Sequence, residues 1–214
     1  MRKLIIDADT GSDDAVALVM AIRNLPKESI LGITIAAGNV PLKQGISNAL
    51  YVNELCDTNI NVYAGESAPM HRPYIELDNM EQATAHALSE DPASSSAQYV
   101  HGADGLGDIG LEPKNTNYSD VSALDFYRET LKKNTDNEIV ALGPLSNIAR
   151  LIQEEPKLLG SIKHCYIMGG CSNGVGNITK TAEYNFWVDP EAADIVLKSE
   201  IPILSLIHIS EPTR

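Results

Sequence analysis

The sequence has few cysteines, few aromatic residues and a shortage of positive charge. Only three of its 214 residues are cysteines, and no CxxC pair occurs, which predicts no disulfide framework. Sixteen Lys and Arg face 29 Asp and Glu, so the formal net charge is -13. That balance excludes nucleic acid and anionic membrane surfaces as natural partners. A neutral or cationic small molecule fits better.

Long apolar runs are also missing. Only Leu4, Ile5 and Ile6 lie between the basic start of the chain and Asp7, too few for a signal-peptide core, and no stretch approaches membrane-spanning length. The chain is 43% hydrophobic and can bury one core as a single domain. We therefore expect a cytoplasmic protein in a reducing setting, without membrane contact. Association of identical copies stays open.

Acidic residues, by contrast, are concentrated near the start, where residues 4–17 read LIIDADTGSDDAVA. The three apolar residues predict a buried strand. Thr10 and Asp13 have the spacing of a capping box, and apolar residues then recur at helical spacing up to Ile22. The pattern therefore predicts a strand-to-helix loop that carries four carboxylates, those of Asp7, Asp9, Asp13 and Asp14.

Four carboxylates on one loop predict a metal site. Like charges this close repel one another unless a cation binds among them, and a hard divalent cation prefers oxygen ligands. The stretch contains no His or Cys, which argues against zinc. The alternative is a helix N-terminus with acids that suit its dipole. That alternative explains Asp13 and Asp14, but not Asp7 and Asp9, which precede the helix.

Further along the chain, apolar strand patterns alternate with helical ones. This alternation predicts an α/β fold, an open, mainly parallel, Rossmann-like sheet with helices on both faces. Residues 66–111 are rich in Pro, Gly and Ser and predict long loops, with one helix near 80–88. The expected strands cover residues 4–6, 30–37, 60–64, 139–142, 164–168 and 201–204, and further helices are expected around 46–55, 121–133 and 190–198.

Polar residues follow several of these strands. Asp7 to Asp14, Asn39, Leu142 and Met168 lie at or just past predicted strand ends. Ligands bind open α/β sheets at the carboxyl edge of their strands, so these residues are expected to meet. Glu183 and Asn185 alternate with apolar neighbours, which predicts that they share one side of an extended segment. Their donors and acceptors suit vicinal hydroxyls, although a polar loop rim explains them equally well.

Four blocks of the sequence resemble the inosine-uridine-preferring nucleoside hydrolases. DADTGSDDA at residues 7–15 is similar to the family's DxDxGxDDA signature, and HGADGLG at 101–107 to its HGxDGxG segment. The stretch EIVALGPLSNIA at 138–149 is similar to the ALGPLTNIA block. Residues 168–193 resemble the MGG…GN…AEFN..VDPEAA pattern, with Tyr184 where Phe is usual.

The resemblance implies the nucleoside hydrolase fold and calcium-dependent hydrolysis of the N-glycosidic bond of ribonucleosides. It places Ca²⁺ on Asp9, Asp14 and the Leu142 carbonyl, with Asp9 also as the general base. Asp7 would orient the loop from behind these ligands. The residues that would contact the ribonucleoside are Asp13, Asn39, His101, Met168, Asn177, Glu183 and Asn185.

Two other function classes remain open at this point. Haloacid-dehalogenase-type phosphatases also begin with an apolar strand and DxD and use Mg²⁺, but their motif continues with Gly-Thr, whereas this chain has Thr10-Gly11. A non-catalytic remnant that keeps part of a sugar pocket is the second class.

The resemblance covers residues 3–204. We therefore expect residues 1–204 to form an incomplete nucleoside hydrolase domain and residues 205–214 to be a non-native tail. The later part of family members carries a His-Asp pair that nothing here matches, because His208 is followed by Ile209. We therefore expect the chain as given to be weakly active or inactive, and poorly stable.

Overall fold

A computed structural model describes residues 2–72, 74–75, 94–172 and 175–206. Its centre is a six-stranded sheet in the order β3-β2-β1-β6-β7-β8, and every pair is parallel. The strands are β1 (Lys3–Ala8), β2 (Ile30–Ile35), β3 (Val62–Ala64), β6 (Asn137–Ala141), β7 (Ile162–Met168) and β8 (Ile203–Leu206). A separate pair joins β4 (Tyr74–Ile75) to β5 (Ser94–Ser95). The open parallel α/β sheet predicted from the sequence is confirmed.

The strand order reverses between β1 and β6. The chain moves outward from β1 through β2 to β3, then returns to the other side of β1 and moves outward again through β6, β7 and β8. The loops that leave β1 and β6 therefore turn away from each other and open a crevice at the carboxyl edge of the sheet. Asp9 and Leu142 lie on these two loops.

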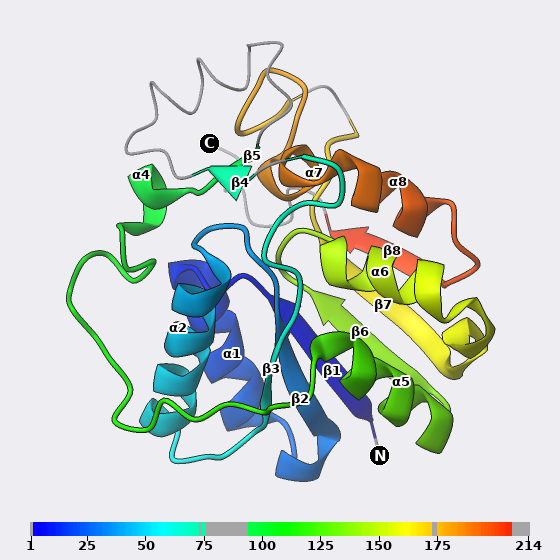
Figure 1. The fold of residues 1–214 in the computed structure, drawn as a ribbon, viewed down its shortest axis with the longest axis horizontal. Helices are drawn as coiled ribbons and strands as arrows, with labels where there is room; N and C mark the ends of the chain where they lie inside the picture. The colour runs from blue at the N-terminus through cyan, green and yellow to red at the C-terminus, as the bar shows by residue number, and fades with distance from the viewer. Residues whose placement is uncertain (1, 73, 76–93, 173–174, 207–214) are drawn as a thin grey trace.

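Helices cover the two faces unequally (Figure 1). On one face, Leu4, Ile6 and Ala8 of β1 share a core with the helices α1 and α2, while Ile5 points into the opposite core, beneath α5 and α6. The helices are α1 (Ser12–Asn24), α2 (Leu42–Leu55), α4 (Gln98–His101), α5 (Ala123–Lys133), α6 (Ser146–Glu154), α7 (Tyr184–Val188) and α8 (Pro190–Leu197). Two 3-10 helices cover Lys27–Ser29 and Pro156–Ser161.

The start of the chain differs from the expectation in two details. Asp7 lies inside β1, not on the following loop, because the strand continues to Ala8. The first helix is capped by Gly11, whose N–H donates to the Asp14 carboxylate at 2.9 Å, so the predicted pairing of Thr10 with Asp13 is wrong. The helix expected near residues 80–88 lies outside the described residues.

Among the described residues, a groove is left on the α1 face of the sheet beside β6 and β7. Its volume is about 360 Å³, and Val140, Tyr166 and Leu206 are among its lining residues. Leu204 on the edge strand β8 is 50% exposed. β8 continues two residues past position 204, and residues 207–214 of the expected tail lie outside the described part. Within the described ranges, no helix is long and apolar enough to cross a membrane.

This exposed edge predicts a route to aggregation. Unpaired N–H and C=O groups beside apolar side chains invite strand addition, and a charge on the edge opposes it. We expect Leu204→Lys to slow aggregation several-fold, measured by static light scattering. The control is Leu197→Lys, which changes a side chain of similar exposure, 52%, on the helix α8 and not on a strand. An equal effect of the two substitutions would contradict the role of the β8 edge.

Candidate active site

Asp9 lies between two glycine loops. It follows β1 directly, and its side chain is fully buried. A Cβ built on Gly38, after β2, would lie 2.1 Å from Asp9 Oδ2, and one built on Gly143, after β6, would lie 2.6 Å from Asp9 Oδ1. Only glycine permits this approach from both sides, so the two loops enclose the carboxyl group with backbone atoms.

Asp14 lies beside Asp9, in the first turn of α1. Its Oδ2 accepts hydrogen bonds from the Gly11 N–H at 2.9 Å and from Asn39 Nδ2 at 3.1 Å. Asp9 Oδ2 accepts from the Asn39 N–H at 2.6 Å, whereas the buried Asp9 Oδ1 has no hydrogen-bond partner. Asn39 therefore contacts both carboxyl groups, one through its backbone and one through its side chain.

Burial dominates the electrostatics of this pair. Burial, followed by the charge of Asp14, raises the pKa of Asp9 well above its usual range. Burial and then the charge of Asp13 raise the pKa of Asp14 to about 7. Without a cation, the two carboxyl groups cannot both ionise at neutral pH at an acceptable free energy.

The oxygen atoms available as metal ligands near Asp9 fit a hard divalent cation. They comprise two buried carboxyl groups, one with an unpartnered oxygen, and the Leu142 carbonyl at the end of β6. Among the described residues, no group of three or more His, Cys, Asp or Glu side chains is placed to hold a metal, so such a site would depend on main-chain oxygen as well. Oxygen-only ligands suit Ca²⁺ or Mg²⁺ and do not suit zinc.

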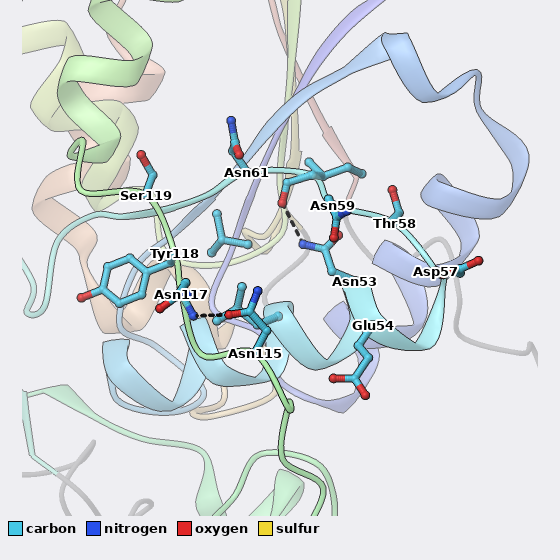
Figure 2. A pocket seen from close by; sticks show the side chains of 13 residues that line it. Asn53, Glu54, Asp57, Thr58, Asn59, Asn61, Asn115, Asn117, Tyr118 and Ser119 are labelled. Carbon is cyan, nitrogen blue, oxygen red and sulfur yellow. Dashed lines mark hydrogen bonds between the residues drawn. The ribbon is translucent and has the colours of Figure 1, made fainter.

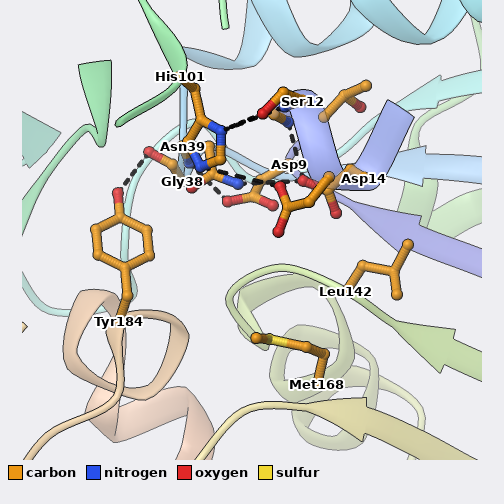
Figure 3. A network of polar contacts seen from close by, with 12 residues as sticks. Asp9, Ser12, Asp14, Gly38, Asn39, His101, Leu142, Met168 and Tyr184 are labelled. Atoms are coloured by element: carbon orange, nitrogen blue, oxygen red, sulfur yellow. Dashed lines mark hydrogen bonds and ion pairs between the residues drawn. The ribbon is translucent and has the colours of Figure 1, made fainter. Parts of the chain in front are cut away.

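A pocket of about 230 Å³ opens beside the carboxyl pair. Figure 3 shows His101, Asn39 and the acids on one side, with Leu142 and Met168 opposite them. The residues singled out from the sequence that line this one pocket are Asp13, Asn39, His101, Leu142, Met168, Asn177, Glu183 and Asn185. Asp9 and Asp14 are not among its lining residues and reach it through their hydrogen bonds to Asn39.

The segment of Glu183 and Asn185 is not extended, so that prediction is wrong. Glu183 caps α7 and accepts hydrogen bonds from the N–H groups of Asn185 and Phe186, and Asn185 lies in the first turn. Asn185 Nδ2 donates to the Leu142 carbonyl at 2.8 Å and to the Met168 carbonyl at 3.0 Å. Asn185 thus links the carboxyl ends of β6 and β7 through its side-chain nitrogen. Its side-chain oxygen is the atom that a ligand could contact.

His101 is held against the start of α1. Its Nδ1 accepts from the Ser12 N–H at 3.3 Å and lies 2.8 Å from the Ser12 hydroxyl. The accepted N–H bond leaves the ring proton on Nε2, which lies 3.9 Å from Asp13 Oδ1. Burial lowers the pKa of His101, against the opposing charge of Asp13. A neutral imidazole therefore presents an N–H near the pocket.

Asp7 is buried within β1 and is not among the residues that line the pocket, and no sequence pattern indicated its hydrogen-bond partners. Its Oδ2 accepts hydrogen bonds from Thr34, from Tyr127 at 3.1 Å and from Asn147 at 2.8 Å. Burial raises its pKa to about 6 despite these three bonds. Tyr99 also lines the pocket, and no sequence pattern indicated it.

A larger cavity of about 560 Å³ lies at the opposite edge of the sheet, where α2 ends and β3 begins. Figure 2 shows its amide-rich wall, in which Asn53 donates to the Ile60 carbonyl at 2.8 Å. Its lining includes Asn59, Asn61 and Asn115 but no residue predicted to act in catalysis or binding. The smaller pocket beside Asp9 is therefore the candidate active site.

The family model described as inosine-uridine preferring nucleoside hydrolase matches residues 4–212. The chain is 36% identical over 206 residues to the pyrimidine-specific ribonucleoside hydrolase RihB of Escherichia coli strain SE11, covering 96% of this chain and 59% of that protein. It is 37% identical over 207 residues to an uncharacterized protein of Schizosaccharomyces pombe, covering 95% of this chain and 60% of that protein.

Solved structures agree with these relatives. A plant nucleoside hydrolase superposes with a TM-score of 0.80 at 30% identity, over 97% of this chain and 60% of its own. A purine-preferring ribonucleoside hydrolase from Gardnerella vaginalis gives a TM-score of 0.77, also at 30% identity, over 96% of this chain and 60% of its own. The chain thus spans about 60% of the length of the curated relatives it matches.

The close approach of the Gly38 and Gly143 loops to the Asp9 carboxyl group predicts that Gly38 tolerates no side chain. Gly38→Ala should lower the free energy of unfolding by about 1–3 kcal/mol, because the added methyl group would overlap Asp9. Urea denaturation measures the change. Gly160→Ala is the matched control, since a Cβ there meets nothing within 4 Å, and its effect should stay within about 0.5 kcal/mol. An equal loss of unfolding free energy in the two variants would contradict the close packing of Gly38 on Asp9.

Proposed function

The chain belongs to the inosine-uridine preferring nucleoside hydrolase family, and from this membership we propose that it hydrolyses the N-glycosidic bond of ribonucleosides to ribose and free base. The observation that carries the proposal is the pocket beside Asp9 and Asp14, which gathers acids, amides and a neutral imidazole at the carboxyl edge of the sheet. The relatives' names include both pyrimidine-specific and purine-preferring enzymes, so we propose a ribonucleoside without naming its base.

We propose Ca²⁺ as the cofactor, held by Asp9, Asp14 and the Leu142 carbonyl. Bound there, the ion would let both buried carboxyl groups ionise and would acidify a water molecule for attack on the sugar. Asn185 donates to the same Leu142 carbonyl and so fixes the direction of its lone pairs. Asp7, anchored by three donors, would keep β1 and therefore Asp9 in place.

Asp9 is the proposed general base. Its Oδ2 is occupied by the Asn39 N–H, and its Oδ1 has no partner in the structure. Oδ1 is therefore the atom that would take the proton from the attacking water. As the bond between the ribose and the nucleobase breaks, positive charge develops on the ribose ring, as in glycoside hydrolysis generally. The acids around the pocket would stabilise that charge.

The remaining pocket residues are proposed to grip the ribose. The Glu183 carboxylate is held in a fixed orientation by the Gly170, Asn185 and Phe186 N–H groups, and carboxylate oxygens are acceptors suited to sugar hydroxyls. Asn39, Asn177 and Asp13 offer further polar groups, and Met168, 40% exposed, offers an apolar surface for the ring. Contacts that tighten as ring charge develops lower the barrier as well as KM.

Ribose release from uridine and inosine tests the proposal. Because the chain as given is expected to be weakly active at most, the enzyme is used in excess over substrate with added Ca²⁺; we expect slow release of ribose and free base from both nucleosides, and no phosphate from a phosphomonoester. Phosphate release without base release would overturn the proposal in favour of phosphatase chemistry. Nucleoside binding in calorimetry without any cleavage would overturn it in favour of a non-catalytic pocket.

Asp14→Asn tests the calcium site within that assay. The change removes a buried charge and keeps the shape, so the metal-free fold should be retained, while calorimetry should show calcium affinity at least tenfold weaker and base release should be lost. Asp136→Asn is the control, because Asp136 is exposed and its positive φ of 59° suits Asn equally. Calcium affinity that is unchanged in Asp14→Asn would contradict the assignment.

Asn185→Ala separates a site role from a stabilising one. It should lower kcat/KM by about 2 kcal/mol, roughly 30-fold, because it frees two strand ends and removes a group that faces the ribose. Asn137→Ala is the control: its buried amide likewise donates to two carbonyls, those of Asn134 and Ser161, at 3.0 Å each, at the start of β6. Both variants should lose stability, but only Asn185→Ala should lose kcat/KM. An equal loss of kcat/KM in both would contradict the site role.

A further inference from the structure

The peptide group between Gly38 and Asn39 is hydrogen-bonded at both ends. Its carbonyl oxygen accepts from the Tyr184 hydroxyl at 3.0 Å, and its N–H donates to Asp9 Oδ2 at 2.6 Å. The described chain has no cis peptide bond, so the C=O and N–H of this group point in opposite directions. Figure 3 shows the resulting line of contacts from Tyr184 through Gly38 and Asn39 to Asp9.

This peptide group determines how Asp9 is held. The Asn39 N–H occupies Oδ2 and leaves Oδ1 as the unpartnered oxygen. Gly38 is pressed against the carboxyl group, because even a Cβ at that position would overlap Oδ2. A rotation of the peptide plane would therefore move the N–H away from Oδ2 and alter which oxygen of Asp9 is available.

Tyr184 is well placed to prevent that rotation. Its side chain is only 8% exposed and packs in a buried cluster with Ala97, Ile178 and Val188. Its own N–H donates to Asn177 Oδ1 at 2.8 Å. A donor fixed in this way holds the carbonyl end of the peptide group, and hydrogen bonds in a chain polarise one another, so the bond to the carbonyl also strengthens the N–H as a donor to Asp9.

We infer that Tyr184 is a positioning residue, which orients the Asp9 carboxyl group through the Gly38–Asn39 peptide group without touching Asp9. The inference rests on the proposed function for the role of Asp9 as general base. It is independent of that function for the orientation itself. The hydroxyl is the feature that matters, and it stands where the resembling family pattern usually has Phe.

Tyr184→Phe removes only this hydroxyl, and the Asn39 amide reports the result. In ¹H–¹⁵N spectra of the metal-free chain, we expect the Asn39 amide proton to move upfield and its hydrogen exchange to become roughly tenfold faster. Tyr63→Phe is the matched control: Tyr63 is also 8% exposed, and its hydroxyl also takes part in a hydrogen bond, which it accepts from Asn61 Nδ2 at 3.3 Å. An Asn39 amide that does not move, or moves equally in both variants, would overturn the inference.

A second variant keeps the test decisive if Tyr184→Phe unfolds. Site-specific 3-fluorotyrosine at position 184 is a stronger donor of nearly the same shape, so it should move the Asn39 amide proton downfield, opposite to the Phe variant. A downfield shift supports the inference, and an unchanged shift overturns it.

Kinetics separate this inference from the proposed function. Where the parent cleaves uridine, Tyr184→Phe should lower kcat about fivefold with KM within about twofold, because the ribose contacts are kept. A loss in KM alone would overturn the positioning role. If the parent cleaves no nucleoside, the proposed function fails, while the Asn39 amide still decides whether Tyr184 orients Asp9.

Discussion

Two carboxyl groups buried side by side are the constraint on which the rest of this structure depends. A lone ionised carboxylate in a low-dielectric interior is strongly unfavourable, and a second one nearby adds repulsion. The fold provides neighbours that make the arrangement tolerable: the Gly11 N–H at the start of α1, and the backbone and side-chain amides of Asn39. None of these donors carries a positive charge, so they do not neutralise the negative charge of two ionised carboxylates, and a bound cation would.

The sheet topology explains why this pair forms where it does. Asp9 lies on the loop that follows β1, and Leu142 lies on the loop that follows the neighbouring strand β6; the strand order reverses between these two strands. Asn185 then links the β6 and β7 ends, and Asn147 links Asp7 to the Glu66 N–H after β3 at 2.8 Å. Side-chain amides thus add hydrogen bonds between the carboxyl ends of the strands, beyond the backbone hydrogen bonds of the sheet.

The sequence predicts the layout better than the side-chain roles. Strand and helix patterns, together with the rule that ligands bind at the carboxyl edge, were enough to bring Asp13, Asn39 and Met168 to one pocket. The short α7 was missed because five residues carry too little helical periodicity, so Glu183 and Asn185 were predicted to be extended. The bond from the Tyr184 hydroxyl to Gly38, and the bonds from Tyr127 and Asn147 to Asp7, join residues at least 120 positions apart, and no local pattern encodes such contacts.

The position of β1 has a consequence for how the molecule assembles. Of the described strands β1 is synthesised first, yet it is central in the sheet, and its pairing with β6 joins Lys3 to Asn137 and Asp7 to Ala141. One wall of the Asp9 enclosure, Gly38, belongs to the early half of the chain, whereas the other, Gly143, arrives only after β6. During synthesis the acidic loop therefore stays hydrated until the second half docks, so nascent chains postpone the dehydration of their carboxylates to a late, long-range closure step.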